Sequence, residues 1–467
     1  MVRRALHQGA TVAPVVDGSS WPKGSGAATS SGSVACMSTK VKVGLLGCGN
    51  VGGALVELVA EQRDEIAGRT GVDLEITRIA VHSTAKDRGL DVPAEIFTTD
   101  AAAVVVDPEV DVVVETIGGI EPARELVLSA IGAGKPVITA NKELLANHGA
   151  ELYDAAAEAG VDLLYEAAVA GAIPLMRPLR ESLIGEPVSR VMGIVNGTTN
   201  YILSQMAEHG VSYGDALAEA QSLGYAERDP TADVEGYDAG AKAAIIASIA
   251  FGARVVAGDV YHEGISGITS ADIDFAKRLG YVIKLLAVTE RVGDQDGVPV
   301  VAVRVHPAMV PGTHPLASVR DSFNAVFVEG GASGELMFYG RGAGGRPTAS
   351  AVLGDLIDAA SNRIEDTAAS IGTLVRPRIQ PIDELESAYY LNLEVHDEPG
   401  VLATVASIFG QHKVSIRSME QEGLGDDARL IFITHPAIER DVRATLQELR
   451  SLDSVRQVGA MLRVIGA

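Results

Sequence analysis

One pair of oppositely charged residues lies in an otherwise apolar stretch of the sequence. Asp238 and Lys242 are four residues apart, so on a helix they share one face. The rest of 237–251 is almost entirely alanine, isoleucine and other apolar residues, and a helix that is apolar on all sides is normally buried. An exposed pair at this spacing would add only ~0.2–0.5 kcal/mol, and a buried pair costs desolvation energy that apolar residues avoid. We therefore predict a general acid or base, because a partly desolvated lysine can change its pKa.

A glycine-rich loop at 47–52 follows the apolar segment 43–46 and precedes a helical stretch from Ala54. Glycine at the three fixed positions of such a loop allows a tight turn, close approach of a pyrophosphate, and close packing of helix on strand. The helix N-terminus adds positive potential. The strand before the loop and the helix after it favour a dinucleotide site over an ordinary glycine-rich turn. The residues of this predicted site are Gly47, Gly49, Asn50, Val51 and Gly52.

The end of the second expected strand bears on the choice of dinucleotide. An NAD-selective site would have an acidic residue there to bind the ribose hydroxyls. The sequence has Ala-Val-His-Ser at 80–83, followed by Lys86 and Arg88. These cations suit a 2′-phosphate, so we predict NADP, with NAD as a possible cofactor. The alternative is that both are solvated surface charges.

The nucleotide loop opens a segment in which apolar runs alternate with helical stretches. Strands this apolar, separated by helices, are typical of a parallel sheet that is covered on both faces. We therefore predict a doubly wound α/β nucleotide-binding domain. The runs are 41–46, 74–81, 110–115, 136–139 and 161–165.

Two further domains are expected. Strand-like segments at 189–195, 299–306 and 325–329 lie among longer helices and indicate an α+β catalytic domain. The C-terminal part reads strand, helix, strand, strand, helix, strand, which is the ferredoxin-like βαββαβ order. The predicted organisation is a disordered tail over 1–38, the nucleotide-binding domain over 39–165 with a return segment over 341–371, the catalytic domain over 166–340, a proline-containing linker over 372–388 and the C-terminal domain over 389–467.

The stretch from Ala220 to Lys242 resembles the signature of the homoserine dehydrogenase family. Further matching segments are 47–52, 140–142, 166–174, 196–200 and 340–349, so the resemblance covers essentially all of 39–376. The family interconverts L-aspartate 4-semialdehyde and L-homoserine with NAD(P)H, a step of threonine, methionine and isoleucine biosynthesis. The resemblance implies this reaction.

The resemblance also implies roles for individual residues. Lys242 corresponds to the proton donor to the aldehyde oxygen, where negative charge develops during reduction. The implied substrate-binding residues are Glu227, Asp233, Asp238 and Lys142. Further implied cofactor contacts are Lys142, Thr116, Gly224 and Gly344. A sodium site is implied at Glu166, Val169, Gly171 and Ile173, where oxygen ligands suit a hard cation. From the residues alone, Lys142 could be a surface residue at a helix start and Glu166 a capping residue.

The segment 389–467 resembles an ACT-type regulatory domain, with 397–402 as its first strand-to-helix loop. Pro399 at a helix start, beside Gly400, leaves backbone N–H groups free to meet an amino-acid carboxylate, although an ordinary capping turn would look alike. Such modules are associated with end-product inhibition, so L-threonine is the expected effector. Sheets of this fold commonly pair at their edges, which suggests a homo-oligomer, a dimer or tetramer. The predicted effector residues are Asp397, Gly400 and Leu402.

Composition excludes several classes of protein. With 38 basic and 61 acidic residues the formal charge is −23, which argues against a nucleic-acid partner. Apolar runs such as 243–251 are far shorter than the ~20 residues of a membrane helix. Two cysteines in the whole chain provide no disulfide framework or thiolate metal site, so a reducing cytoplasm is the expected location.

Two other functions are alternatives. An aspartate-semialdehyde dehydrogenase needs a cysteine nucleophile, but Cys36 lies in the expected tail and Cys48 in the nucleotide loop. A non-catalytic amino-acid sensor could keep the nucleotide fold, yet it would not need Lys242 buried beside Asp238. An assay of NADPH oxidation with aspartate semialdehyde separates the sensor from the enzyme.

Overall fold

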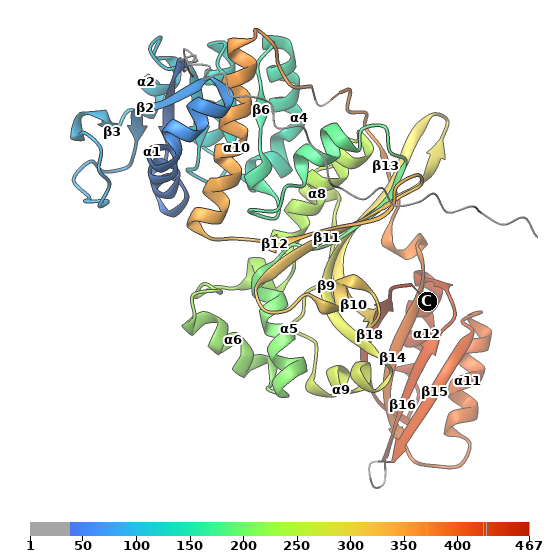
Figure 1. Ribbon diagram of the computed structural model, residues 1–467. Coiled ribbons are helices and arrows are strands. Elements are labelled where there is room, and N and C mark those ends of the chain that lie inside the picture. The colour runs from blue at the N-terminus through green and yellow to red at the C-terminus, as the bar shows by residue number, and fades with distance from the viewer. Residues whose placement is uncertain (1–37, 371, 424, 426, 467) are drawn as a thin grey trace, which may run out of the picture. The chain divides into compact units, whose positions relative to one another are not determined.

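A computed structural model describes residues 38–370, 372–423, 425 and 427–466 (Figure 1). The predicted tail over 1–38 lies, except for Ser38, outside these described residues. In the part of the chain that is described, no helix combines the length and the apolar character needed to cross a membrane.

The first sheet has six strands in the order β3-β2-β1-β4-β5-β6, and every pairing is parallel. This confirms the predicted doubly wound fold. Its strand order reverses between β1 and β4, where ligands of such sheets bind. The strands are β1 (Thr39–Leu46), β2 (Val72–Ala80), β3 (Phe97–Thr98), β4 (Val112–Glu115), β5 (Val137–Thr139) and β6 (Leu163–Leu164).

Helices cover both faces of this sheet, as its apolar strands require. Helices α1 (Asn50–Thr70) and α10 (Gly345–Ile364) pack on one face and against each other. Thus the chain returns to the first sheet after the second one. The helices on the other face are α2 (Ala101–Val106), α3 (Ala123–Gly132) and α4 (Lys142–Ala159).

The second sheet begins with five antiparallel strands in the order β12-β11-β7-β9-β10. They are β7 (Val188–Ile194), β9 (Tyr281–Gln295), β10 (Val298–Pro311), β11 (Phe323–Gly330) and β12 (Gly334–Arg341). Helices α5 (Gly197–His209), α8 (Tyr237–Phe251) and α9 (Ser270–Arg278) pack on it. Helices α6 (Tyr213–Ser222) and α7 (Thr231–Val234) lie between α5 and α8 in the chain.

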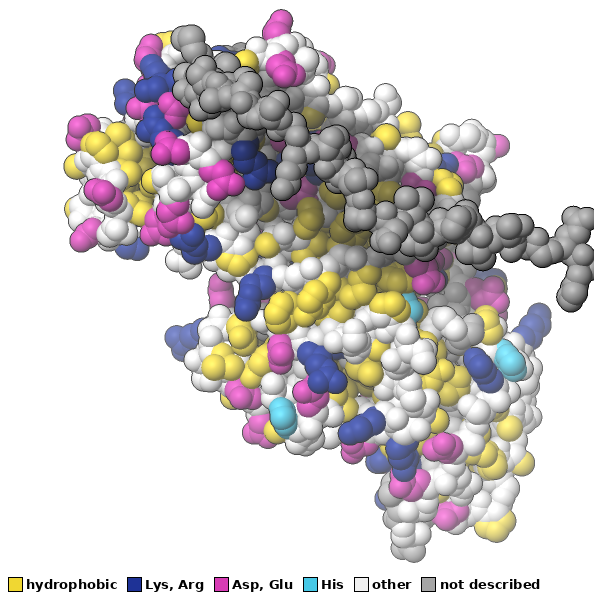
Figure 2. Space-filling view, in the orientation of Figure 1, with side chains coloured by type: hydrophobic (Ala, Val, Ile, Leu, Met, Phe, Trp, Pro, Cys, Tyr) yellow, Lys and Arg dark blue, Asp and Glu magenta, His cyan; other side chains and the backbone are white. Residues whose placement is uncertain are grey.

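Two strands of this sheet were not predicted, β9 and β12. Strand β9 is buried over most of its first half without alternating polar residues, so its period gives no clear strand signal. Strand β12 is an outer strand whose apolar side chains stay partly exposed, with Tyr339 55% exposed. Figure 2 shows apolar side chains gathered over β11 and β12.

The C-terminal unit has the predicted βαββαβ order. Its elements are β14 (Glu386–His396), α11 (Val401–Gln411), β15 (Ile416–Gly423), β16 (Asp427–Thr434), α12 (Glu439–Leu449) and β18 (Val455–Val464), with a short β17 (Ala437–Ile438) before α12. Its two helices pack on one face of its sheet, over a separate apolar core. The other face packs on the catalytic unit, where the Tyr390 hydroxyl lies 3.2 Å from an Asp272 carboxylate oxygen at α9.

The two sheets of the catalytic and C-terminal units form one continuous sheet. Strand β18 pairs in parallel with β10 through Ala308 with Arg463 and Met309 with Val464. The order therefore continues β10-β18-β14-β16-β15. The sequence patterns predict each unit but not this junction.

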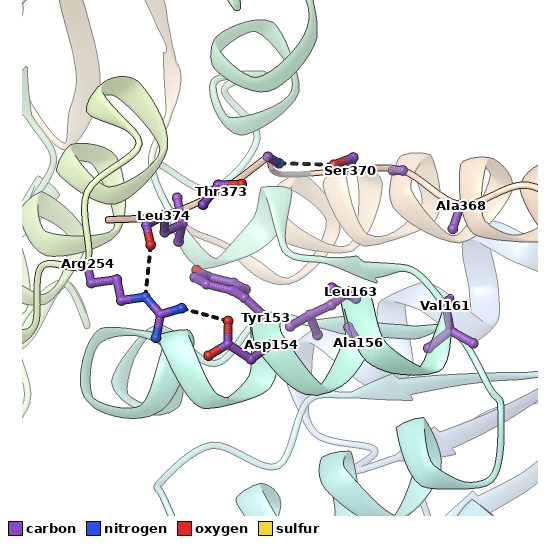
Figure 3. A pocket seen from close by; sticks show the side chains of 14 residues that line it. Tyr153, Asp154, Ala156, Val161, Leu163, Arg254, Ala368, Ser370, Thr373 and Leu374 are labelled. Atoms are coloured by element: carbon purple, nitrogen blue, oxygen red, sulfur yellow. Dashed lines mark hydrogen bonds and ion pairs between the residues drawn. The ribbon is translucent and has the colours of Figure 1, made fainter. Parts of the chain in front are cut away.

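The predicted linker also contacts the catalytic unit. Val375 forms a bridge with Ala253, and β13 (Arg378–Ile379) pairs with β10. Arg254 donates from Nε to the Leu374 carbonyl at 3.0 Å and from Nη2 to Asp154 of α4 at 2.8 Å, and Figure 3 draws both contacts. The backbone of this stretch therefore has sheet partners in the catalytic unit.

Candidate active site

Asp238 is the centre of a buried cluster of charges. Its carboxylate oxygen Oδ2 accepts a hydrogen bond from Lys242 Nζ at 2.7 Å, and Oδ1 forms an ion pair with Lys142 Nζ. The side chains of Asp238 and Lys242 are 7% and 12% exposed. The predicted pair therefore lies on one face of a buried helix, and not at the surface.

The sequence did not indicate that Lys142 and Asp238 touch. Asn141 caps α4 by accepting a hydrogen bond from the Leu144 amide at 3.1 Å, so the helix begins at Lys142, directly after β5. This places the lysine at the carboxyl edge of the first sheet and brings it to a carboxylate of the catalytic unit. Lys142 is thus more than a surface residue at a helix start.

The two ammonium groups determine the charge of the carboxylate. Burial by itself would raise the pKa of Asp238, but Lys242 and Lys142 outweigh it and hold that pKa well below its usual range. Burial would also lower the pKa of Lys142, and Asp238 reverses this, so that pKa is raised. The cluster therefore keeps an ionised carboxylate between two cations.

The Lys242 ammonium has a second acceptor, the Val195 carbonyl at 2.7 Å. That carbonyl lies directly after β7, so the sheet and helix α8 together aim the ammonium. An ammonium has three N–H donors. Among the described residues, the hydrogen bonds to Asp238 and Val195 use two of them.

The predicted substrate residues line one cavity of about 740 Å³. Lys142 reaches it from α4, Glu227 from the loop before α7, and Asp233 and Asp238 from α7 and α8. Lys242 is not among the lining residues, but it donates a hydrogen bond to Asp238, which is. The arrangement provides carboxylates for a substrate ammonium and cations for an oxygen or carboxylate.

Asn196 belongs to the cluster but was not predicted as a site residue. Its side-chain nitrogen donates to Asp233 Oδ1 at 2.7 Å and to Asp238 Oδ2 at 2.9 Å. Its oxygen caps α5 by accepting from the Thr199 amide at 2.9 Å. Asparagine before a helix is a capping signal, but nothing local to 196 indicates the two aspartates.

The nucleotide loop lies beside a second cavity, of about 550 Å³. Gly47, Gly49 and Thr116 line it together with Lys86 and Arg88 from the loop after β2. The cations that the sequence placed near a 2′-phosphate therefore face the same cavity as the glycine loop. Arg88 is anchored there, since it donates to the Ser83 carbonyl at 2.9 Å.

The glycines of the loop are required for different structural reasons. Gly47 has φ +93, and a Cβ on Gly52 would lie 2.3 Å from the Gly47 carbonyl oxygen. A Cβ on Gly49 would meet nothing within 4 Å, which leaves room for a ligand. No side chain caps α1 at Gly49, so its first N–H groups stay available. These features fit a pyrophosphate cradle.

The other predicted cofactor contacts lie at different distances from this loop. The Thr116 hydroxyl donates to the Gly47 carbonyl at 3.0 Å. Gly344 precedes α10, whose Gly345 packs so closely that a Cβ there would lie 2.9 Å from the Asn50 carbonyl oxygen. Gly224 lies in an exposed turn after α6, outside the residues that line the two cavities. The structure thus groups Thr116 and Gly344 with the loop, and not Gly224.

Glu166, the predicted sodium ligand, has its carboxylate engaged by the backbone. It accepts hydrogen bonds from the amides of Met176 and Arg177, both at 2.8 Å, and of Leu175. These are the capping contacts of the alternative interpretation. Among the described residues, no backbone hydrogen bond ends on the carbonyl oxygens of the other three predicted ligands, Val169, Gly171 and Ile173.

The predicted effector loop lies between β14 and α11. Gly400 has φ +94, and no side chain caps the helix that follows it. The Asp397 carboxylate accepts a hydrogen bond from Gln421 of β15 at 3.4 Å. The helix begins at Val401, two residues after Pro399.

Three family models match the chain. "Homoserine dehydrogenase, NAD binding domain" matches residues 47–166, "Homoserine dehydrogenase" matches 174–357 and "ACT domain" matches 389–454. The matches follow the three structural units.

Similar proteins extend the match to nearly the whole chain. A homoserine dehydrogenase of Corynebacterium glutamicum is 52% identical over 425 residues, which cover 91% of this chain and 95% of that protein. One from Mycobacterium tuberculosis is 49% identical, covering 91% and 98%. The crystal structure of a homoserine dehydrogenase from Thiobacillus denitrificans has a TM-score of 0.86 at 41% identity, covering 91% and 98%.

The dinucleotide fold and the buried lysine site define an NAD(P)-dependent oxidoreductase that acts on a CH–OH group. The predicted ACT-type unit is confirmed by its family model. The chain belongs to the homoserine dehydrogenase family, as the motif between Ala220 and Lys242 predicts. The reaction of this family is the NAD(P)H-dependent interconversion of L-aspartate 4-semialdehyde and L-homoserine.

Proposed function

We propose that Lys242 donates the proton when this chain reduces L-aspartate 4-semialdehyde to L-homoserine, and accepts it in reverse. The observation that carries this proposal is the buried ammonium of Lys242, held by Asp238 and Val195. The dinucleotide supplies the hydride to the carbonyl carbon. As charge grows on the carbonyl oxygen, a fixed ammonium stabilises and protonates it.

The other residues of the cluster position the substrate. Glu227 and Asp233 line the cavity and suit the substrate ammonium, since charge-assisted hydrogen bonds are strong. Asp238 holds both lysines and stays ionised. Lys142 is the first residue of α4, in the nucleotide-binding domain, and its side chain lines the substrate cavity. We therefore assign it to both the cofactor site and the substrate site.

Kinetics of two variants test these roles. We expect Lys242→Ala to lower kcat about 10²- to 10⁴-fold and Asp238→Asn to lower it strongly, while both proteins keep their far-UV circular dichroism. NADPH oxidation is followed with aspartate semialdehyde. Absence of turnover by the unaltered chain would instead support the amino-acid sensor.

We propose NADP as the preferred cofactor, with NAD as the weaker alternative. The support is the pair Lys86 and Arg88, which line the nucleotide cavity after β2. An archaeal homoserine dehydrogenase "in complex with NADPH" has a TM-score of 0.57 at 28% identity, covering 69% of this chain and 98% of that one. Equal kcat/KM with NADPH and NADH would contradict the preference.

We propose that a sodium ion binds beside Glu166. Three buried carbonyl groups without backbone hydrogen bonds, at Val169, Gly171 and Ile173, fit the oxygen ligands that a hard cation takes. The Glu166 carboxylate, already bonded to three amides, would orient this loop. Retention of full thermal stability and activity when sodium is replaced by a bulky organic cation would contradict the site.

We propose that the ACT-type unit binds L-threonine at Asp397, Gly400 and Leu402 and thereby inhibits the enzyme, in threonine, methionine and isoleucine biosynthesis. The uncapped start of α11 offers N–H donors to a carboxylate. We expect Asp397→Ala to weaken inhibition without changing the uninhibited rate. Removal of the whole unit is a poorer test, because β18 is a partner of β10.

We propose that the chain forms a homo-oligomer, a dimer or tetramer, in the cytoplasm. The partly exposed apolar side chains of β12 and the outer strand β15 support association. Sedimentation equilibrium gives the assembly. A monomer at micromolar concentration would contradict it.

A further inference from the structure

Asn196 holds a rigid place between a strand and a helix. Its side-chain oxygen accepts hydrogen bonds from the Thr199 amide at 2.9 Å and the Thr199 hydroxyl at 3.0 Å. A flipped amide would aim its N–H groups at the Thr199 amide donor, so these contacts fix which end is nitrogen. The nitrogen therefore points away from helix α5.

The fixed nitrogen bridges two carboxylates. It donates to Asp233 Oδ1 at 2.7 Å and to Asp238 Oδ2 at 2.9 Å, and an amide nitrogen has two N–H groups. The residue itself is buried. A neutral group thus joins two aspartates that would otherwise repel each other.

The two aspartates depend on this amide to different degrees. Asp238 also accepts from Lys242 and pairs with Lys142. For Asp233, Asn196 is the hydrogen-bond donor among the described side chains, whereas Lys242 and Lys142 act on it from farther away. Loss of the amide would therefore deprive Asp233 of this hydrogen bond, while Asp238 would still be held by the two lysines.

The pKa of Asp233 depends on the groups around it, and the Asn196 amide is one of them. Burial and the charge of Asp238 raise the pKa of Asp233, while the Asn196 hydrogen bond and the two lysines lower it, and the net shift is upward. The other titratable groups of the same cavity are Glu143, Glu227, Asp229, Tyr237 and His262.

We infer that Asn196 is a positioning residue, whose amide holds the Asp233 carboxylate at the substrate cavity, separate from Asp238, where it receives the substrate ammonium. This inference rests on the proposed function, because it gives Asp233 a substrate role. It adds a residue that touches neither substrate nor cofactor and acts through another.

The test uses two variants of the full chain that keep an acceptor for the cap of α5. Serine still caps helices but is too short to bridge the aspartates. Asn196→Ser should raise KM for aspartate semialdehyde about 10- to 100-fold, as expected for a lost hydrogen bond to a charged group. It should change kcat and KM for NADPH less than about threefold, within the ordinary effect of a neutral neighbour. The acid limb of kcat/KM should move to higher pH, because Asp233 loses the donor that favours its charge.

Asn196→Asp keeps the shape and the cap but replaces a double donor by a third carboxylate. It should raise KM further than Asn196→Ser and move the acid limb further. Because aspartate caps helices as well as asparagine does, this variant gives the test if Asn196→Ser does not fold. Unchanged substrate KM and pH profile in the folded variant would overturn the inference.

Asn200→Ser is the matched control. Asn200 lies on the same helix and is buried, but its amide donates to the carbonyls of Asp321 and Phe323, away from the cavity. It should lower the melting temperature and leave substrate KM and the acid limb in place. An equal change of KM in both serine variants would show a general effect of damage to α5 and would overturn the inference.

A double variant tests whether Asn196 acts through Asp233. If it does, Asn196→Ser combined with Asp233→Asn should have about the same KM as Asp233→Asn alone, since effects of a shared path do not add. Multiplied effects would contradict the inference. Failure of the proposed function is separate, because it would appear as retained turnover in Lys242→Ala.

Discussion

Two buried carboxylates in this molecule are each held by two cations, and they serve different ends. In the active site Asp238 is held by two lysines. In the C-terminal unit Glu439 is held by Arg463, at 2.8 Å from Nε and 2.6 Å from Nη2, and by Arg443, at 2.9 Å from Nε. Both aspartate and glutamate have a lowered pKa, because the cations outweigh the effect of burial.

The difference lies in the cations and in what surrounds them. A lysine ammonium is a compact donor that can release a proton, whereas an arginine guanidinium keeps its proton and binds carboxylates with two parallel bonds. The lysine cluster opens to a cavity. In the arginine cluster the side chains of Arg463 and Glu439 are 2% and 0% exposed, and Arg463 also donates to Glu263 of the catalytic unit at 2.8 Å, beside the β10–β18 junction. A carboxylate held by two cations therefore lies at the candidate active site in one region and joins two structural units in the other.

The largest expected effect comes from giving the active site the cation of the other cluster. Lys242→Arg keeps a positive charge beside Asp238 but replaces a proton donor by a group that does not release its proton. We expect kcat to fall about 10²- to 10⁴-fold with the melting temperature little changed, measured by NADPH oxidation and calorimetry. If the variant kept a tenth or more of the original kcat, proton donation by Lys242 would not be what distinguishes the lysine cluster from the arginine cluster.

The reverse experiment removes a cation from the arginine cluster. Arg463→Ala leaves Glu439 without its bidentate partner, and loss of one member of a buried pair costs about 3–5 kcal/mol. We expect the free energy of unfolding in urea to fall by that amount, while kcat of the folded enzyme stays within about twofold. If kcat fell as far as in Lys242→Arg, the two clusters would not have separate roles. Arg440→Ala, which removes an exposed arginine next to Glu439 on α12, is the control.

The cations of the nucleotide cavity provide a third point of comparison. Lys86 and Arg88 line the nucleotide cavity on an exposed loop. The double variant Lys86→Ala and Arg88→Ala should raise KM for NADPH about tenfold or more, since hydrogen bonds to charged groups contribute ~1.5–3 kcal/mol. KM for NADH and the free energy of unfolding should stay unchanged. An equal rise of KM for both dinucleotides would contradict a 2′-phosphate contact.

The smallest expected effect is on the pH dependence of stability. Both carboxyl groups have a folded-state pKa below the unfolded value of about 4. Their contribution is therefore complete above that value and is lost as pH falls through the folded pKa. The destabilisation caused by Asp238→Asn or Glu439→Gln should vary by less than ~0.5 kcal/mol between pH 5 and 8 and shrink below about pH 4. Urea unfolding across this range checks it, and a destabilisation that grew on acidification would have the wrong sign.

Signals that are local in the chain identified most of the fold and part of the site. The apolar surroundings of Asp238 and Lys242 predict their burial, and the glycine loop between strand and helix predicts the dinucleotide fold. The order of elements in 389–467 predicts the third unit. In each case the information lies within one element or in neighbouring elements, where spacing along the chain determines which side chains share a face.

Contacts between distant segments were decided only in three dimensions. The sequence by itself determined that Asp238 has a lysine one helical turn away; the tertiary structure decided that Lys142 comes from another unit to pair with it and that Asn196 bridges it to Asp233. It likewise decided that β18 joins β10. The physical reason is that helix periodicity specifies a face but not the partner of that face, and an edge strand offers the same backbone hydrogen bonds to any strand that reaches it.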